Sequence, residues 1–318
     1  MLNSRIYLAA AAVSVLAMVA PVAASANVTF TDASGMYTVG IGPDGELYDN
    51  TTGVGLRNPA GSDYIAPGTP RDSWGISNGT TSAYADYEYY GTSNITGSTL
   101  TTGANTATTT STTAMGLTVA QKFTFFSANI VSVQETVTNT TGAAQNVIFQ
   151  RDVDYDVFPT EFNENTVGPF GADSQVIDSS YYGFENPDPL AAYGSSCFSG
   201  CNQQGDLGAG IKLSLGMLGA GDSTTFAYFY GINQPGQTLT GLINQAQTEG
   251  LAYTLGTQSS ENGDYPNQGA GAAILGVGLV GVVAHGVPEP ATWAMMLVGF
   301  GGLGLALRSS RRRQALTA

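Results

Sequence analysis

The chain has 318 residues, of which 11% are charged, and its 10 Lys and Arg against 24 Asp and Glu give a net charge of −14. An ordinary soluble domain is about 25% charged. Hydrophobic residues make up 42% of the chain, which is enough to form a core and excludes a fully disordered protein. Ten basic residues are too few for the clustered Lys and Arg that a phosphate backbone requires, so we expect no nucleic-acid partner.

The first 26 residues have the pattern of a secretory signal peptide. Arg5 precedes an apolar run over residues 6–20, and Ala24 and Ala26 supply the small residues at which signal peptidase cuts. The run is shorter than the roughly 20 residues that span a bilayer, which disfavours the alternative of an uncleaved anchor. We therefore expect signal peptidase to act here and the exported chain to begin at Asn27.

Residues 27–286 are predicted to form one exported domain with a net charge of −18, from five basic and 23 acidic residues. Apolar and polar residues alternate, as is typical of strands, in the runs 130–139, 146–157, 211–217 and 223–232. Turn-forming residues separate such runs at 43–45, 140–142 and 219–222. Connections of hairpin length predict an all-β fold, either an antiparallel β-sandwich or a barrel-like closed sheet.

The segment from residue 92 to 113 is rich in threonine. Eleven of its 22 residues are Thr and three are Ser. Threonine favours strands, and this composition also occurs in glycosylated stalks. We expect an exposed hairpin or loop here.

Three aspartates, Asp152, Asp154 and Asp156, alternate with apolar residues at the end of the run 146–157. Alternation places their carboxylates on one face, about 7 Å apart, where they repel one another unless water or a cation neutralises them. Calcium, a hard cation that binds oxygen, is the natural neutraliser, although the spacing is not that of an EF-hand. Two interpretations stay open: a solvated outer face of a strand, or a calcium site. No other cofactor is expected.

Cys197 and Cys201 are the only cysteines, and export into an oxidising compartment predicts a disulfide between them. A zinc site needs more ligands, and the single histidine, His285, lies far along the chain. Any Ser-His-Asp or Cys-His nucleophile would have to use this histidine, which sits in a valine-rich stretch. We therefore expect no catalytic residues and a protein that is not an enzyme.

One segment departs from the strand pattern. Between residues 238 and 250, apolar side chains recur at i, i+3, i+4 and i+7, with Thr238 placed to cap the start and Gly250 to end the helix. This spacing predicts a single short helix that covers an edge or face of a sheet. A last buried strand is expected within residues 274–283.

The end of the chain, residues 287–318, combines three elements in order. The rigid tripeptide Pro288-Glu289-Pro290 comes first, residues 291–307 follow without a charge, and Arg311-Arg312-Arg313 stands behind them. The uncharged segment is at the lower edge of the length of a transmembrane helix. The arginines would keep the end of the chain in the cytoplasm. This predicts a C-terminal transmembrane helix with the domain outside the inner membrane.

This arrangement resembles the PEP-CTERM protein-sorting signal, in the variant in which Trp-Ala-Met-Met follows the Pro-Glu-Pro box. The resemblance covers residues 287 to about 313, roughly a tenth of the chain. It implies an exosortase as partner, a membrane-embedded enzyme of Gram-negative bacteria that would cut near the box. An inner-membrane intermediate would then give a cell-surface or extracellular product. The alternative is a plain C-terminal anchor.

Three functions compete for the exported domain. The first is a non-enzymatic protein of the cell surface or extracellular matrix, which the lack of any catalytic spacing favours. The second is a secreted polysaccharide hydrolase, which needs a pair of carboxylates that no spacing singles out. The third is a polysaccharide-binding module that uses exposed tyrosines. The candidates for that role are Tyr87, Tyr89, Tyr90, Tyr181 and Tyr182.

Overall fold

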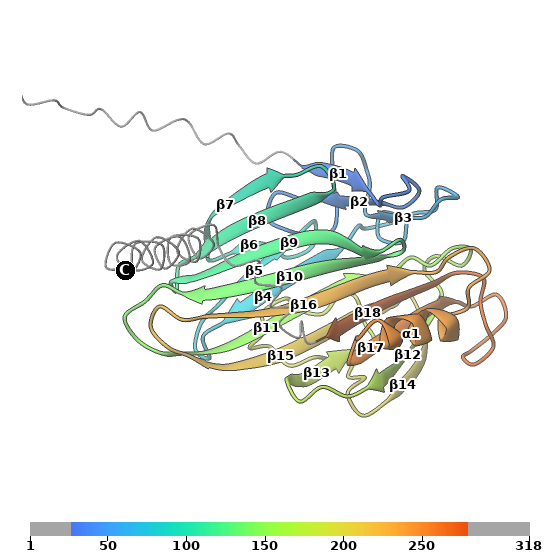
Figure 1. Cartoon of the computed structure of the whole chain (residues 1–318). Helices are drawn as coiled ribbons and strands as arrows, with labels where there is room; N and C mark the ends of the chain where they lie inside the picture. The colour runs from blue at the N-terminus through green and yellow to red at the C-terminus, as the bar shows by residue number, and fades with distance from the viewer. Residues whose placement is uncertain (1–26, 279–318) are drawn as a thin grey trace, which may run out of the picture.

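The computed structural model describes residues 27–278, most of which lie in antiparallel sheets (Figure 1). One sheet has nine strands: β7 (Ile95–Thr102), β8 (Thr106–Thr113), β9 (Leu117–Ser127), β10 (Ile130–Asn139), β12 (Glu164–Gly171), β14 (Cys201–Gly205), β16 (Ser223–Ile232), β17 (Tyr253–Ser259) and β18 (Ala272–Gly278). A second has six: β4 (Asp72–Ser77), β5 (Ser82–Asp86), β6 (Gly91–Ser93), β11 (Gln145–Asp154), β13 (Val176–Ser180) and β15 (Gly208–Leu218). The third contains β1 (Val28–Thr31), β2 (Thr38–Ile41) and β3 (Leu56–Arg57).

The two large sheets pack face to face as a sandwich (Figure 1). Their strand orders are β14-β12-β17-β18-β16-β10-β9-β8-β7 and β13-β15-β11-β4-β5-β6. Both orders end in an unpaired edge strand, so the described strands do not close into a barrel. The predicted antiparallel all-β fold is confirmed, and the four alternating runs form β10, β11, β15 and β16.

Strand β16 shows how alternation builds the core. Phe226, Tyr228 and Tyr230 face the six-stranded sheet and belong to the main core, whereas Ala227 and Phe229 face the other way. The Tyr228 hydroxyl donates to the carbonyl oxygen of Ile211 in β15, at 2.9 Å. Both faces of the nine-stranded sheet are therefore covered where β16 lies.

The second cover is the predicted helix, α1 (Leu239–Thr248), which is confirmed. Thr238 caps it, because its hydroxyl accepts a hydrogen bond from the backbone N–H of Gly241 at 3.2 Å. Its apolar face packs on the outer side of the nine-stranded sheet, and its buried residues are Leu239, Leu242, Ile243 and Ala246. Gly256 of β17 permits this approach, since a Cβ there would lie 2.8 Å from Leu239.

The threonine-rich segment forms β7 and β8, a hairpin at the edge of the nine-stranded sheet. Most of β7 is exposed, as predicted. Alternate residues of β8 are buried, among them Thr109, Ser111 and Thr113, because the inner face of this strand still lies over the core.

The predicted last strand begins within β18, and its residues beyond Gly278 lie outside the described part of the chain. The predicted signal peptide, with Ala24 and Ala26, and the predicted transmembrane segment also lie outside it. Within residues 27–278, no helix has the length and apolarity that crossing a membrane requires.

Candidate functional site

The aspartates at the end of β11 are all buried: 0% of Asp152, 3% of Asp154 and 1% of Asp156 is exposed. The interpretation of a solvated outer face is therefore wrong. The physical reason is a long connection between β13 and β14, which crosses the outer side of the six-stranded sheet. A Cβ at Gly183 of this connection would lie 2.5 Å from the Cα of Asp154, and one at Gly75 of β4 would lie 1.9 Å from the carbonyl oxygen of Pro187.

Asp152 has its own hydrogen-bond partners under this cover. Its Oδ1 accepts from the Tyr193 hydroxyl at 2.8 Å, and its Oδ2 accepts from Gln150 Nε2 at 2.6 Å. Burial raises the pKa of Asp152 to about 7, although the Arg71 guanidinium acts in the opposite direction. Because both of its oxygens have donors, Asp152 is a poor ligand for a cation.

Asp154 and Asp156 gather instead with Asp206, which lies in the turn between β14 and β15. One carboxylate oxygen of each lies within 4.8 Å of the other two. We call these three residues the acidic cluster. Asp206 is exposed while the other two are buried, so the cluster opens to solvent at Asp206.

Several carboxylate oxygens of the acidic cluster lack partners. Asp154 Oδ1 and both carboxylate oxygens of Asp156 are buried and accept no hydrogen bond. Nearly all buried polar groups in proteins are hydrogen-bonded, and each exception requires an explanation. Burial of an unpaired charge is also costly.

The electrostatics of the acidic cluster follow from burial and mutual repulsion. Burial raises the pKa of Asp156 to about 8, and the neighbouring Glu164 and Asp206 raise it further. Burial and then Asp156 hold the pKa of Asp154 well above its usual range. Burial also raises the pKa of Asp206. Burial and mutual repulsion therefore oppose ionisation of all three aspartates.

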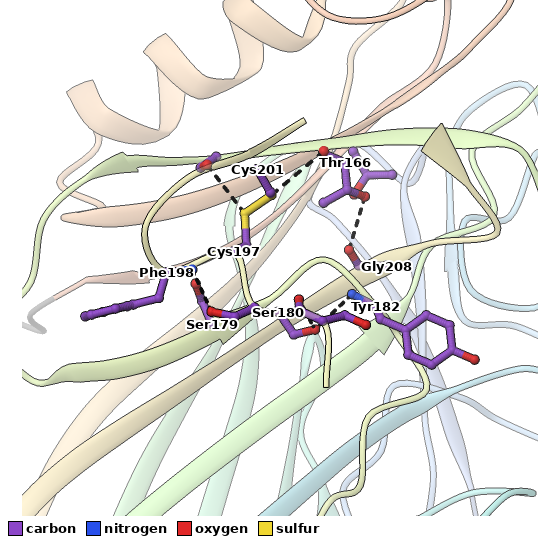
Figure 2. The surroundings of a disulfide bond; sticks show 12 residues. Thr166, Ser179, Ser180, Tyr182, Cys197, Phe198, Cys201 and Gly208 are labelled. Atoms are coloured by element: carbon purple, nitrogen blue, oxygen red, sulfur yellow. Dashed lines mark hydrogen bonds between the residues drawn. A yellow bond between two sulfur atoms is a disulfide. The ribbon is translucent and has the colours of Figure 1, made fainter. Parts of the chain in front are cut away.

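Glu164, the first residue of β12, connects the segments that carry the acidic cluster. Its two carboxylate oxygens accept from the backbone N–H groups of Val157 and Leu207, at 3.3 and 3.4 Å. Burial raises its pKa to about 7. Nearby, the Thr166 hydroxyl donates to the carbonyl oxygen of Gly208 at 3.2 Å, which joins β12 to the start of β15 (Figure 2).

The structure contains a disulfide between Cys197 and Cys201 (Figure 2). Cys201 is the first residue of β14, and Asp206 follows directly after this strand. The disulfide therefore fixes the start of β14, the strand that leads to the exposed member of the acidic cluster. No sequence pattern pointed to Asp206, because it lies more than fifty residues beyond Asp154.

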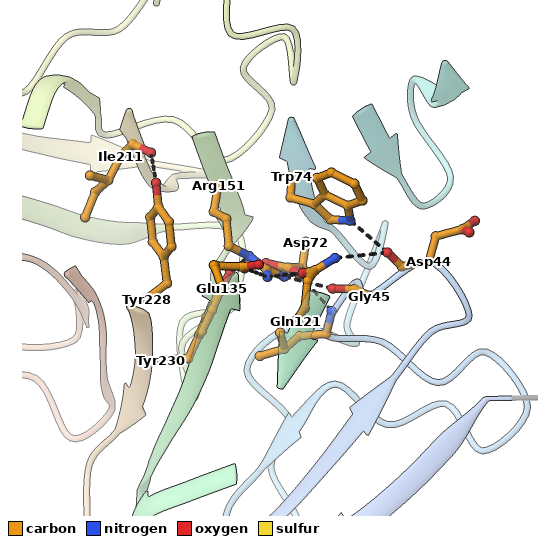
Figure 3. Close-up of polar contacts among 11 residues, drawn as sticks. Asp44, Gly45, Asp72, Trp74, Gln121, Glu135, Arg151, Ile211, Tyr228 and Tyr230 are labelled. Atoms are coloured by element: carbon orange, nitrogen blue, oxygen red, sulfur yellow. Dashed lines mark hydrogen bonds and ion pairs between the residues drawn. The ribbon is translucent and has the colours of Figure 1, made fainter. Parts of the chain in front are cut away.

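Arg151, on β11 beside the aspartates, points into the space between the two large sheets (Figure 3). It forms an ion pair with Asp72 of β4 at 2.6 Å, and it donates a hydrogen bond to Glu135 Oε1 of β10 at 2.9 Å. Its remaining hydrogen bonds go to Gln121, Gly45 and Tyr230. All five guanidinium N–H donors are thus used.

The two carboxylates around Arg151, those of Asp72 and Glu135, differ in how fully they are hydrogen-bonded. Asp72 Oδ2 accepts from Arg151 and from the backbone N–H of Leu47, and its Oδ1 accepts from the Tyr230 hydroxyl. Burial raises the pKa of Glu135 to about 8 despite Arg151, and its Oε2 has no partner. The positive charge of Arg151 is thus offset by Asp72, and the raised pKa of Glu135 means that this residue keeps its proton at neutral pH.

The candidate tyrosines divide into two groups. Tyr87 pairs with Tyr48, and Tyr181 packs against the main core. Tyr89, Tyr90 and Tyr182 are exposed by 58%, 40% and 37%. Their rings contact one another or Phe184, and we call Tyr89, Tyr90, Tyr182 and Phe184 the aromatic cluster.

The aromatic cluster rests on a buried cation. The Arg71 guanidinium lies 5.2 Å from the ring centre of Phe184 and 5.5 Å from that of Tyr90. Asp86 holds it in an ion pair of 2.7 Å. Since Gly183 abuts Asp154, the same connection carries part of the aromatic cluster and covers the acidic cluster.

Comparison with known proteins gives a match at the end of the chain. A model of the PEP-CTERM protein-sorting motif matches residues 286–313, which include Pro288-Glu289-Pro290 and Arg311-Arg312-Arg313. No curated protein matches the chain. The predicted resemblance is confirmed: the chain carries a PEP-CTERM sorting motif, which marks it as an exported protein sorted by an exosortase.

Proposed function

We propose that this protein is a non-enzymatic component of the cell surface or extracellular matrix, delivered there by exosortase processing. The observation that carries the proposal is the sorting motif at residues 286–313, directly behind a β-sandwich domain. Signal peptidase would remove residues 1–26. The inner membrane would hold the chain only until an exosortase cuts near the Pro-Glu-Pro box.

The chemistry of the described domain supports a role other than catalysis. The only histidine of the chain is His285, and both cysteines are joined in the disulfide. In the acidic cluster, two of the three carboxylates are buried and all lie within 4.8 Å. A glycoside hydrolase needs its two carboxylates on either side of a bound sugar, whereas two members of this cluster are covered by the chain.

A second candidate function, polysaccharide binding, is favoured by the aromatic cluster. Tyr89, Tyr90 and Tyr182 present ring surface and hydroxyl groups at one place on the exterior. Amphipathic rings of this kind suit ligands with apolar faces and polar edges, as sugars have. The charge of −18 on residues 27–286 would repel an anionic polysaccharide, so a neutral one is the expected ligand.

Replacement of Pro288-Glu289-Pro290 by three alanines tests the main proposal. Export and membrane insertion should persist, because the apolar segment and the arginines are unchanged, but full-length protein should accumulate in the inner membrane. The matched control replaces Ser309 and Ser310 by alanine, which alters the same tail outside the box. C-terminal peptides in membrane and surface fractions provide the measurement. A parent protein that stays full-length in the membrane, like the variant, would establish a plain anchor instead.

A further inference from the structure

We propose that Asp154, Asp156 and Asp206 bind a divalent cation, and that this cation is calcium. The site goes beyond the proposed function, because sorting by an exosortase requires only the C-terminal motif. Two independent features lead to it: the convergence of three carboxylates and the absence of any donor to the buried oxygens among them.

The convergence has the dimensions of one coordination shell. Two oxygens on opposite sides of a calcium ion lie about 5 Å apart, since each Ca–O distance is about 2.3–2.6 Å. The oxygens of the acidic cluster lie within 4.8 Å of one another. One ion could therefore contact all three carboxylates without a rearrangement of the strands.

The second feature is the set of unpartnered oxygens. Asp156 is 1% exposed, and neither of its carboxylate oxygens accepts a hydrogen bond. Asp154 Oδ1 is also buried and accepts no hydrogen bond. Arg71, whose charge acts on Asp154, has its donors in other interactions. Arg71 donates to Asp86 and to the carbonyl oxygens of Gly183 and Glu185. A bound cation would supply the charge that the chain does not.

The donor set selects the class of metal. Three carboxylates are hard oxygen ligands, which suit calcium or magnesium, whereas zinc prefers nitrogen and sulfur. Magnesium requires near-ideal octahedral geometry and gives up its water reluctantly. Calcium tolerates irregular shells, and here water would complete the shell on the open side, at Asp206.

Binding would connect two separate parts of the fold. Asp154 ends β11, Asp156 follows it, and Asp206 lies in the turn from β14 of the nine-stranded sheet to β15 of the six-stranded sheet, so the ion would tie this turn between the sheets to the end of β11. It would bind the folded chain only, because the three residues are dispersed in the unfolded one. Calcium should therefore stabilise the protein by mass action.

The test uses the full chain, freed of metal with a chelator and titrated calorimetrically with calcium chloride and, separately, magnesium chloride. Calcium should bind at one site, and magnesium at least tenfold more weakly. At a hundredfold excess of calcium over its Kd, the melting temperature should rise by about 5–10 °C. No heat of binding and no shift would overturn the proposal. Equal affinity for magnesium would overturn the assignment to calcium.

Two variants locate the site. Asp156→Asn and Asp206→Asn should each raise the calcium Kd at least tenfold. Since Asp206 is exposed, its variant tests binding without disturbing the interior. In chelator, Asp156→Asn should melt no lower than the parent, because it removes one of several mutually repelling carboxylates.

The control is Asp222→Asn, an exposed aspartate beyond the opposite end of β15, which should bind calcium like the parent. A response of Asp206→Asn equal to that of Asp222→Asn would refute the site.

Discussion

Arg151 and the acidic cluster both place ionisable groups inside the protein, but their surroundings differ. All donors of Arg151 have partners, and Asp72 offsets its charge. Asp154 and Asp156 lie only a few residues further along the chain and keep unpartnered oxygens beside a third carboxylate. At Arg151, the chain supplies a counter-charge to the buried ion, and the guanidinium group holds the two sheets together. At the acidic cluster, the chain supplies no counter-charge and the site opens to solvent, so an external cation has room to bind.

The largest effect expected from this comparison is that of Arg151→Met. The variant leaves Asp72 buried without its counter-charge, and removal of one partner of a buried ion pair costs about 3–5 kcal/mol. Urea unfolding, followed by tryptophan fluorescence, would measure the loss. Lys122→Met on β9 is the matched control, because this lysine is exposed, and its unfolding free energy should change by less than about 0.5 kcal/mol. Equal stability of the two variants would show that the Arg151 network is not structural.

The next prediction concerns Glu135 and pH. Because the pKa of Glu135 in the folded state is raised to about 8, the folded chain holds a proton that the unfolded chain loses above about pH 4.5. The stability associated with this group therefore falls as pH rises toward 8. Glu135→Gln mimics the protonated form. As pH rises from 5 to 8, its free energy of unfolding should therefore increase relative to that of the parent, by at most about 1.4 kcal/mol per pH unit.

Unfolding free energies of parent and Glu135→Gln in chelator, at several pH values, provide this measurement. The difference between the two proteins isolates Glu135 from other groups with raised pKa values, such as Glu46. A difference that does not change with pH would mean that Glu135 is ionised in the folded protein.

A smaller effect should follow from replacement of both Cys197 and Cys201 by serine. The disulfide closes a loop of sequence separation 4, for which loop-closure entropy predicts a loss of about 2 kcal/mol. Since it fixes the start of β14, the strand that leads to Asp206, the calcium Kd should also rise, whereas the pH response of Glu135 should not change. Denaturation with and without calcium would separate these effects. An unaltered Kd would show that Asp206 is positioned without the disulfide.

Sequence patterns predicted the local structure well and its surroundings poorly. Alternation located β10, β11, β15 and β16, and Thr238 marked the start of α1, because these signals depend on neighbouring residues. Alternation also placed the aspartates on one face, but it carries no information on what covers that face. The connection between β13 and β14 buries them, and Asp206 joins them from the turn between β14 and β15, which is distant in the sequence. Pairings of this range depend on the complete sheet topology.

The smallest expected effect concerns the aromatic cluster, where the buried charge of Arg71 is offset by Asp86 and the rings above it stay exposed. If this surface binds a neutral polysaccharide, Tyr89→Ala should weaken binding about twofold to tenfold, since an aromatic contact contributes about 0.5–1.5 kcal/mol. Phe198→Ala is the control, because Phe198 is 44% exposed but lies outside the cluster. Affinity electrophoresis of the full chain in polysaccharide gels would compare the three proteins. Equal retardation of Tyr89→Ala and Phe198→Ala would exclude the aromatic cluster as the binding surface. The same gels run with calcium and with chelator would show whether the cation, which the connection through Gly183 brings close to these rings, also supports binding.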